Sequence, residues 1–290
     1  MAYYSFDKIF IMEKILLAID GTTINKNALD FACYLGRLTQ SKITGAFLEN
    51  LVVYEKPVLE QAHGISYMNW VVDKESSEYK MKMENINNNV SLFKDACEKR
   101  TVRYSIHRNE GQPAKEIIEE SRYADVLVID AETSFSKKFE GVPTEFAKEV
   151  LKEAECPVII APESFDGIDE IVFTYNGSKS SMFAIKQFCY LFPQLDDKKV
   201  TVVQVDEEGL CSDEETQKFK EWISGHYSSI GFHVLKGDTE TELFGYLLKK
   251  KNVFIVMGAY GRSTISRFFK HSRADLLIRT ITQAIFITHY

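Results

Sequence analysis

Residues 257–273, MGAYGRSTISRFFKHSR, bring glycine, hydroxyl and basic side chains together in one segment. Gly258 directly follows a short apolar run that predicts a strand, and Gly261 comes three residues later. Ser272 precedes an apolar-periodic stretch and has an acidic residue three positions on, so it predicts a helix N-cap. A glycine loop that ends at a helix N-terminus presents backbone N–H groups and a favourable dipole, which suit a phosphate group.

The charge of this loop fits the same chemistry. Four basic residues and no acidic residue lie between positions 258 and 273; they are Arg262, Arg267, Lys270 and Arg273. Glycine after a strand and serine before a helix also occur in ordinary connections of α/β proteins. The loop has neither the G-x-x-x-x-G-K-(S/T) spacing of a P-loop nor the G-x-G-x-x-G spacing of a dinucleotide site. Phosphate binding and a plain basic turn therefore both fit the pattern.

An internal repeat surrounds this loop. The matching segments are KILLAIDGT (14–22) with EIVFTYNGS (170–178), VLVIDA (126–131) with FIVMGA (254–259), and PVIIAP (157–162) with AIFITH (284–289). In both halves continuous apolar strands alternate with amphipathic stretches, a pattern that predicts parallel sheets with helices on both faces. We therefore expect an α/β protein that consists of two tandem Rossmann-like domains.

The repeat divides the chain into four segments. They are an N-terminal appendage (1–11), a first domain (12–162), a linker (163–169) and a second domain (170–290). Either Met1 or Met12 fits as the start of translation. The first domain is longer because of an insert near residues 52–100, whose second part, 75–100, predicts a long polar helix. The insert fits either a packing lid or a contact surface for a ligand or partner.

Composition excludes several classes of protein. The net charge of −7 and the pI of about 5.5 disfavour a broad nucleic-acid surface. Five separated cysteines without a C-x-x-C pair argue against a zinc site or a disulfide framework and fit a reducing cytoplasm. Cys33 and Cys189 lie in apolar helical patterns, which predict small buried residues. The absence of an apolar run of about eighteen residues predicts no membrane span. No histidine spacing typical of a metal site occurs, and we assign no catalytic residue.

The loop spacing resembles the universal stress protein (UspA) motif, G-x2-G-x9-G-(S/T). Gly258, Gly261 and Ser272 fall on its first glycine, second glycine and hydroxyl, whereas His271 replaces the third glycine. The resemblance covers nearly the whole chain as two tandem domains, whose strands follow in family order. It implies the adenine nucleotide alpha hydrolase-like fold, with a five-stranded parallel sheet in the order 3-2-1-4-5 in each domain.

The resemblance also implies a nucleotide site. ATP-binding members hold adenine with an Asp at the end of strand one and a backbone group near the end of strand two, and they hold phosphates on the glycine loop. In the second half the corresponding residues are Asn176, Val205, Gly258, Gly261, His271, Ser272 and Arg273. Asn176 fits either an adenine contact or a turn before a glycine. His271 either obstructs close backbone approach or donates a hydrogen bond to phosphate.

The first half reverses this pattern. Asp20 matches the adenine-contacting Asp, but Asp130 and Thr133 stand in place of the first two glycines and Pro143 in place of the third. Thr144 keeps the hydroxyl, which we expect to act only as a helix cap. Residues 130–145 carry a balance of −2 against +4 for residues 258–273, so an anionic triphosphate should prefer the second half. Asp20 and Thr144 are therefore interpreted as a vestigial site.

We expect a cytoplasmic stress-response module that binds ATP or a related adenine nucleotide in its C-terminal domain, with Mg²⁺ if the ligand is a triphosphate. The alternative is a partner-binding scaffold of the same fold that binds no nucleotide, and the third hypothesis is a slow ATPase. Neither nucleic acid nor a membrane is an expected partner. The apolar closing strands of the two halves predict an internal pseudo-dimer, because an apolar edge strand needs covering. A homodimer is a further expected assembly.

Overall fold

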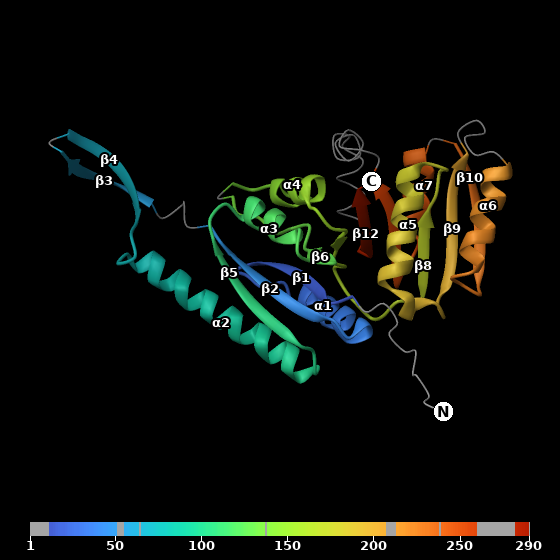
Figure 1. Ribbon diagram of the computed structural model, residues 1–290, viewed down its shortest axis with the longest axis horizontal. Helices are drawn as coiled ribbons and strands as arrows, with labels where there is room; N and C mark the ends of the chain where they lie inside the picture. Colours follow the sequence, from blue (N-terminus) through green and yellow to red (C-terminus); the bar gives the residue numbers. More distant parts are fainter. Residues whose placement is uncertain are drawn as a thin grey trace, which may run out of the picture.

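The computed structural model describes residues 12–50, 55–63, 65–136, 138–206, 213–237, 239–259 and 282–289 of the 290-residue chain. Within these ranges strands and helices alternate along both halves (Figure 1), as the apolar pattern predicts. The elements of the first half are β1 (Lys14–Asp20), α1 (Lys26–Thr39), β2 (Lys42–Glu49), β3 (Glu55–Ala62), β4 (Ile65–Val72), α2 (Ser77–Lys99), β5 (Tyr104–Glu110), α3 (Pro113–Ser121), β6 (Val126–Ile129), α4 (Glu145–Glu153) and β7 (Val158–Ile160).

The second half repeats the plan without the long insert. Its elements are β8 (Glu170–Thr174), α5 (Lys179–Leu191), a 3₁₀ turn (Pro193–Leu195), β9 (Lys199–Asp206), α6 (Asp213–Ser224), β10 (Ile230–Lys236), α7 (Thr239–Leu247), β11 (Val253–Ala259) and β12 (Ala284–His289).

Ten of the described strands form one sheet, in the order β10-β9-β8-β11-β12-β7-β6-β1-β2-β5. Each half contributes five consecutive strands, and all neighbours within a half are parallel. Counted from the first strand of each half, the order is 3-2-1-4-5 in both. The expected α/β fold of two Rossmann-like halves is therefore confirmed.

The two halves meet along their closing strands. β7 and β12 pair antiparallel, with Ile159 opposite Phe286, and both side chains are fully buried. Because each closing strand covers the edge of the other, neither presents unpaired backbone groups to water at this seam. The seam makes one continuous sheet from two repeats (Figure 1).

Apolar side chains fill both faces of the sheet. Along β1, Ile15, Leu17 and Ile19 point to one face, and Leu16 and Ala18 to the other, as expected for a strand buried on both sides. The first face is covered by α1, α2, α5 and α6, and the second by α3, α4 and α7.

Cysteine placement follows the sequence-based expectation. Cys33 of α1 and Cys189 of α5 are both buried in the core of the first sheet face, as predicted, and the burial of Cys189 raises its pKa to about 12. Both are free thiols.

The insert of the first half consists of a helix that packs on the first sheet face and a hairpin that projects from the molecule. Its helix is confirmed as α2 (Ser77–Lys99), which Ser76 caps by accepting a hydrogen bond from the Tyr79 N–H. The preceding residues form β3 and β4, a separate two-stranded antiparallel sheet that projects from one end of the molecule (Figure 1). None of the helices in the described ranges is both long and apolar enough to cross a bilayer.

Candidate nucleotide site

The strand order reverses next to the first strand of each half. β1 lies between β2 and β6, and β8 lies between β9 and β11. In open parallel sheets, ligands bind outside the carboxyl ends of the strands at such a reversal. Asp20 ends β1, and Asn176 lies two residues beyond the end of β8, so both predicted strand-one residues lie at these positions.

Asn176 belongs to a tight turn that leads into α5. Its Oδ1 accepts a hydrogen bond from the Ser178 backbone N–H at 3.2 Å, and Gly177 between them has a φ of 76°, which favours glycine. Ser178 then caps α5, because its Oγ accepts from the Ser181 N–H at 3.1 Å. This geometry gives Asn176 a structural role in the turn, and contact with adenine stays a prediction.

Gly258 lies near the end of β11, against the first turn of α5. A Cβ at this position would come within 2.4 Å of the carbonyl carbon and oxygen of Ser180 and within 2.6 Å of the Ser181 nitrogen. Only glycine fits such close backbone packing. Close packing with α5 therefore explains this glycine by itself, and its approach to phosphate stays a prediction.

The position at which the helix after the first strand begins explains why glycine is required at position 258 but not at the aligned position 130. α5 begins at Lys179, three residues after Asn176 (179 − 176), whereas α1 begins at Lys26, six residues after Asp20 (26 − 20). The earlier start brings the first turn of α5 close to β11. In the first half the residue aligned with Gly258 is Asp130, whose side chain the longer connection accommodates.

The remaining predicted residues of the second half divide into two groups. Val205 lies in β9, and the end of β8 is tied to that strand because the Tyr175 N–H donates to the Val203 carbonyl at 2.9 Å. The structure thus brings Asn176, Val205 and Gly258 to the carboxyl ends of three neighbouring strands. Gly261, His271, Ser272 and Arg273 lie outside the described residues.

In the first half, polar contacts within the protein occupy the aligned loop. Asn25 Nδ2 donates to Asp130 Oδ2 at 2.8 Å, and the Glu132 N–H donates to Asp130 Oδ1 at 3.1 Å. A small pocket at this edge is lined by Asp20, Thr23, Asn25, Asp130 and Thr133, among other residues. Two carboxylates in the lining make this pocket a poor match for a phosphate group.

Thr144 acts as the helix cap that the sequence predicts. Its Oγ1 accepts from the Ala147 N–H at 3.3 Å and donates to the Thr133 carbonyl at 2.5 Å. The residue is 3% exposed, and its own N–H donates to the Ala131 carbonyl at 3.1 Å. Since the hydroxyl already makes contacts inside the loop, the vestigial site has no exposed hydroxyl at this position.

Asp20 lies in a charged environment that no motif around Asp20 predicts. Burial raises its pKa, while hydrogen bonds from the Thr22 N–H (2.9 Å) and hydroxyl (2.8 Å) and the charge of Lys82 oppose the rise. Lys82 comes from α2, is 7% exposed and donates to the Asn50 carbonyl at 2.8 Å. Burial lowers the pKa of Lys82, whereas Glu49 and Asp20 counteract this change.

The helical periodicity of α2 carries the signal that could have revealed Lys82. The buried positions of this helix are Lys82, Ile86, Asn89, Phe93 and Cys97, which recur every three or four residues. A lysine on the same helical face as buried apolar residues indicates that its side chain points toward the sheet that the helix covers.

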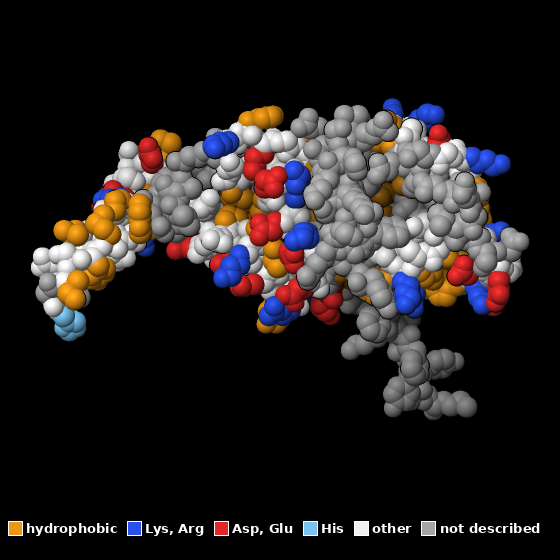
Figure 2. Space-filling view, turned by 90° about the horizontal axis from the view of Figure 1, so that it is seen from above, with side chains coloured by type: hydrophobic (Ala, Val, Ile, Leu, Met, Phe, Trp, Pro, Cys, Tyr) orange, Lys and Arg blue, Asp and Glu red, His pale blue; other side chains and the backbone are white. Residues whose placement is uncertain are grey.

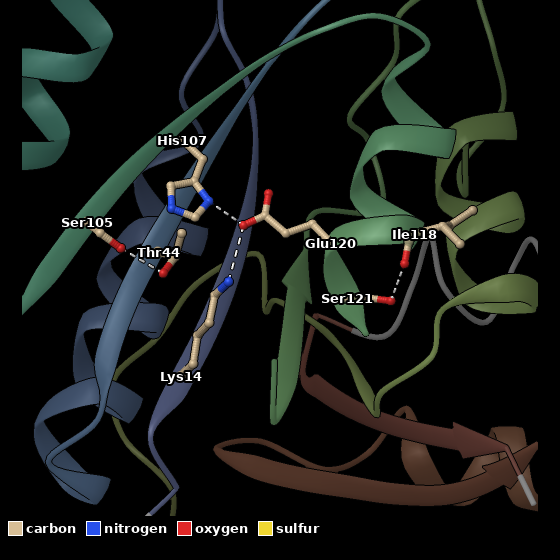
Figure 3. A network of polar contacts seen from close by, with 7 residues as sticks. All are labelled: Lys14, Thr44, Ser105, His107, Ile118, Glu120 and Ser121. Carbon is tan, nitrogen blue, oxygen red and sulfur yellow. Dashed lines mark hydrogen bonds and ion pairs between the residues drawn. The ribbon is translucent and has the colours of Figure 1, made fainter. Parts of the chain in front are cut away.

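A second polar network lies away from the strand ends where the candidate site is (Figure 3). Glu120 of α3 accepts a hydrogen bond from Lys14 Nζ at 3.2 Å, and its Oε1 is 2.5 Å from His107 Nδ1. Nearby, the hydroxyls of Thr44 and Ser105 join β2 to β5 at 2.8 Å. The two contacts of Glu120 fasten α3 to β1 and β5. Nowhere in the described part of the chain do three or more His, Cys, Asp or Glu side chains gather as a metal site would require.

The sequence profile of the Universal stress protein family matches residues 12–162, which is more than half of the chain. The chain belongs to this family. The matched part includes the first reversal of strand order and the long insert. No curated protein sequence matches the chain.

Solved structures extend the likeness of this universal stress protein to both halves. A universal stress protein from Archaeoglobus fulgidus DSM 4304 is 16% identical, with a TM-score of 0.67 over 95% of this chain and 98% of that chain. A functionally unknown protein from Pseudomonas aeruginosa PAO1 is 12% identical, with a TM-score of 0.62 over 96% of this chain and 92% of that chain. At such identities the likeness shows the tandem fold alone.

Proposed function

We propose that this universal stress protein is a stress-response module that binds ATP or a related adenine nucleotide in its C-terminal half, in the crevice beyond β8 and β11. The observation that carries the proposal is the asymmetry between the two reversals of strand order. In the first half, Asp130 and Thr144, the cap of α4, occupy the loop with internal hydrogen bonds. In the second half the aligned residues are Gly258 and Ser272, within a segment of charge +4.

Each proposed ligand contact follows from chemistry. Asn176 would contact the adenine edge, because its amide can both donate and accept, and the backbone at Val205 would supply a further hydrogen bond. Backbone N–H groups at Gly261 and Ser272, together with Arg273 and His271, would face the phosphates. Mg²⁺ would neutralise part of the charge of a triphosphate. No acidic side chain lies between residues 258 and 273 to oppose an anion.

The test is to release small molecules from the purified full-length chain and to identify them by mass spectrometry. An adenine nucleotide in stoichiometric amount is the expected result. Thermal unfolding with and without added ATP and Mg²⁺ is the accompanying measurement, since a ligand that binds only the folded state raises the melting temperature. No released nucleotide together with no thermal shift would overturn the proposal.

A second candidate function is a partner-binding scaffold that holds no nucleotide. Two observations favour it, because close packing with α5 accounts for Gly258 and the turn contact accounts for Asn176 without any ligand. The same mass-spectrometry and thermal-shift measurements distinguish the candidates. Slow ATP hydrolysis would be tested by phosphate release from the nucleotide-loaded chain.

We also infer that the two halves act as an internal pseudo-dimer through the pairing of β7 with β12. Ile159 and Phe286 are fully buried at that seam, so separating the halves would expose apolar area on both. Hydrogen exchange during urea unfolding should show both halves opening in one transition. Two separate transitions would contradict the inference.

A further inference from the structure

The β3–β4 hairpin has two chemically different faces. Residues directly opposite each other in an antiparallel pair project to the same face, and alternate residues project to opposite faces. One face carries the apolar cross-strand pairs Pro57 with Trp70 and Leu59 with Met68. We call these four residues the hairpin apolar face.

The opposite face is polar near its centre. The Tyr67 hydroxyl donates to Glu60 Oε2 at 2.8 Å, and Asn69 Nδ2 donates to Glu60 Oε1 at 3.1 Å. These contacts pair Glu60, Tyr67 and Asn69 with one another within the hairpin. The amphipathic pattern thus resembles one layer of a two-layer structure whose second layer would cover the hairpin apolar face.

The hairpin apolar face is exposed. Leu59 is 64%, Met68 57% and Trp70 61% exposed. Figure 2 shows the gathering of hydrophobic side chains on the hairpin at one end of the molecule. Exposed apolar groups that gather on one face mark an interaction surface. An isolated two-stranded hairpin is also marginally stable in water, so this element needs a covering partner.

We propose that the hairpin apolar face packs against the same face of a second copy of this chain. A twofold symmetric interface brings identical patches together, so the patch must be self-complementary. The four residues carry no charge, and identical apolar faces therefore meet without repulsion between like charges. Residues 55–80 around them contain five acidic and three basic residues, a balance of −2 that disfavours an anionic lipid surface as the partner.

The adjoining helix α2 also carries exposed, uncharged side chains. Met81 and Leu92 on the outside of α2 are 63% and 47% exposed, and the exposed Asn85 and Asn88 lie between them. Their spacing of four, three and four residues is that of a two-helix seam, in which asparagine is tolerated and favours pairing with its own kind. This outer stripe of α2 is uncharged.

The area needed for a stable dimer supports the use of both elements. A standard interface involves about 20–30 residues from each partner. β3 and β4 provide two strands of 8 residues each, of which one face is available, so the hairpin alone falls short. In the proposed dimer the outer stripe of the 23-residue α2 would supply the additional contact area.

The test is sedimentation equilibrium on the full-length chain, with two variants matched in exposure. Leu59→Lys places a charge on the hairpin apolar face, whereas Ile65→Lys places it at a residue that is 70% exposed on the opposite face. We expect a wild-type dimer at micromolar concentration. Leu59→Lys should weaken it by about a hundredfold or more, because a symmetric dimer contains the change twice, and Ile65→Lys should change it by less than about threefold.

A third variant, which lacks the hairpin, is the control for the case that Leu59→Lys acts by unfolding the hairpin. Replacing residues 55–72 by a short glycine-serine connection should also give a monomer, with unchanged circular dichroism in the helical bands. A wild-type chain that is monomeric at about 0.1 mM would overturn the proposal. Equal dissociation by both lysine variants would also overturn it, as would a monomer whose hairpin binds neutral lipid vesicles instead.

Discussion

Replacing Gly258 by alanine tests the close packing between β11 and α5. The added Cβ would come within 2.4 Å of the Ser180 carbonyl carbon and oxygen, whereas unstrained carbon contacts lie at about 3.5–4.0 Å. Backbone must therefore move by more than an ångström, because the contacted atoms do not belong to a flexible side chain. Overpacking a well-packed site costs about 1–3 kcal/mol and occasionally more. We expect Gly258→Ala to lower the free energy of unfolding by about 3 kcal/mol.

Urea unfolding followed by circular dichroism measures this change, with the slope of the transition as a check on compactness. Gly245→Ala is the matched control, since Gly245 lies within α7 and nothing lies within 4 Å of a Cβ there. It should stabilise the protein by about 0.5–1 kcal/mol, because alanine is the better helix former. A Gly258→Ala variant as stable as the wild type would refute the packing argument.

Two further predictions concern carboxyl groups, both checked by urea unfolding at a series of pH values. Burial raises the pKa of Asp20 above its ordinary value of 3.8. The folded state therefore binds the proton more tightly than the unfolded state, and stability falls as pH rises from the ordinary pKa to the raised folded pKa. Asp20→Asn should be more stable than the wild type at pH 7 and equally stable below the ordinary pKa. Burial opposes ionisation of Glu170, but hydrogen bonds from Thr201 and Lys250 outweigh it and lower its pKa. Glu170→Gln should thus cost about 1–3 kcal/mol at pH 7, a loss that vanishes as pH falls through the folded pKa.

The overall architecture could be predicted from sequence because each strand carries its own signal. Continuous apolar runs, repeated in order in both halves, specify buried parallel strands, and the observed order of 3-2-1-4-5 agrees in each half. The helix cap at Thr144 could also be predicted, because the hydroxyl and the helix that it caps are neighbours in the chain.

Features that depend on contacts distant in sequence escaped prediction. The packing role of Gly258 depends on how early α5 starts after β8, which no motif at Gly258 records. The cation near Asp20 comes from α2, more than sixty residues away. The β3–β4 hairpin could not be predicted because Pro57 interrupts the strand pattern of β3. Proline is nevertheless tolerated in a two-stranded sheet, where both strands are edge strands.

Binding of an adenine nucleotide in the C-terminal half can be measured in solution. The most direct measurement is calorimetric titration of ATP and Mg²⁺ into the wild-type chain, Gly261→Val and Thr133→Val at one salt concentration. We expect Gly261→Val to weaken binding by about tenfold or more, because a β-branched side chain blocks close backbone approach to phosphate. Thr133→Val, at the aligned position of the first half, should bind as the wild type does. Equal losses in both variants, or no binding by any of the three proteins, would contradict the claim.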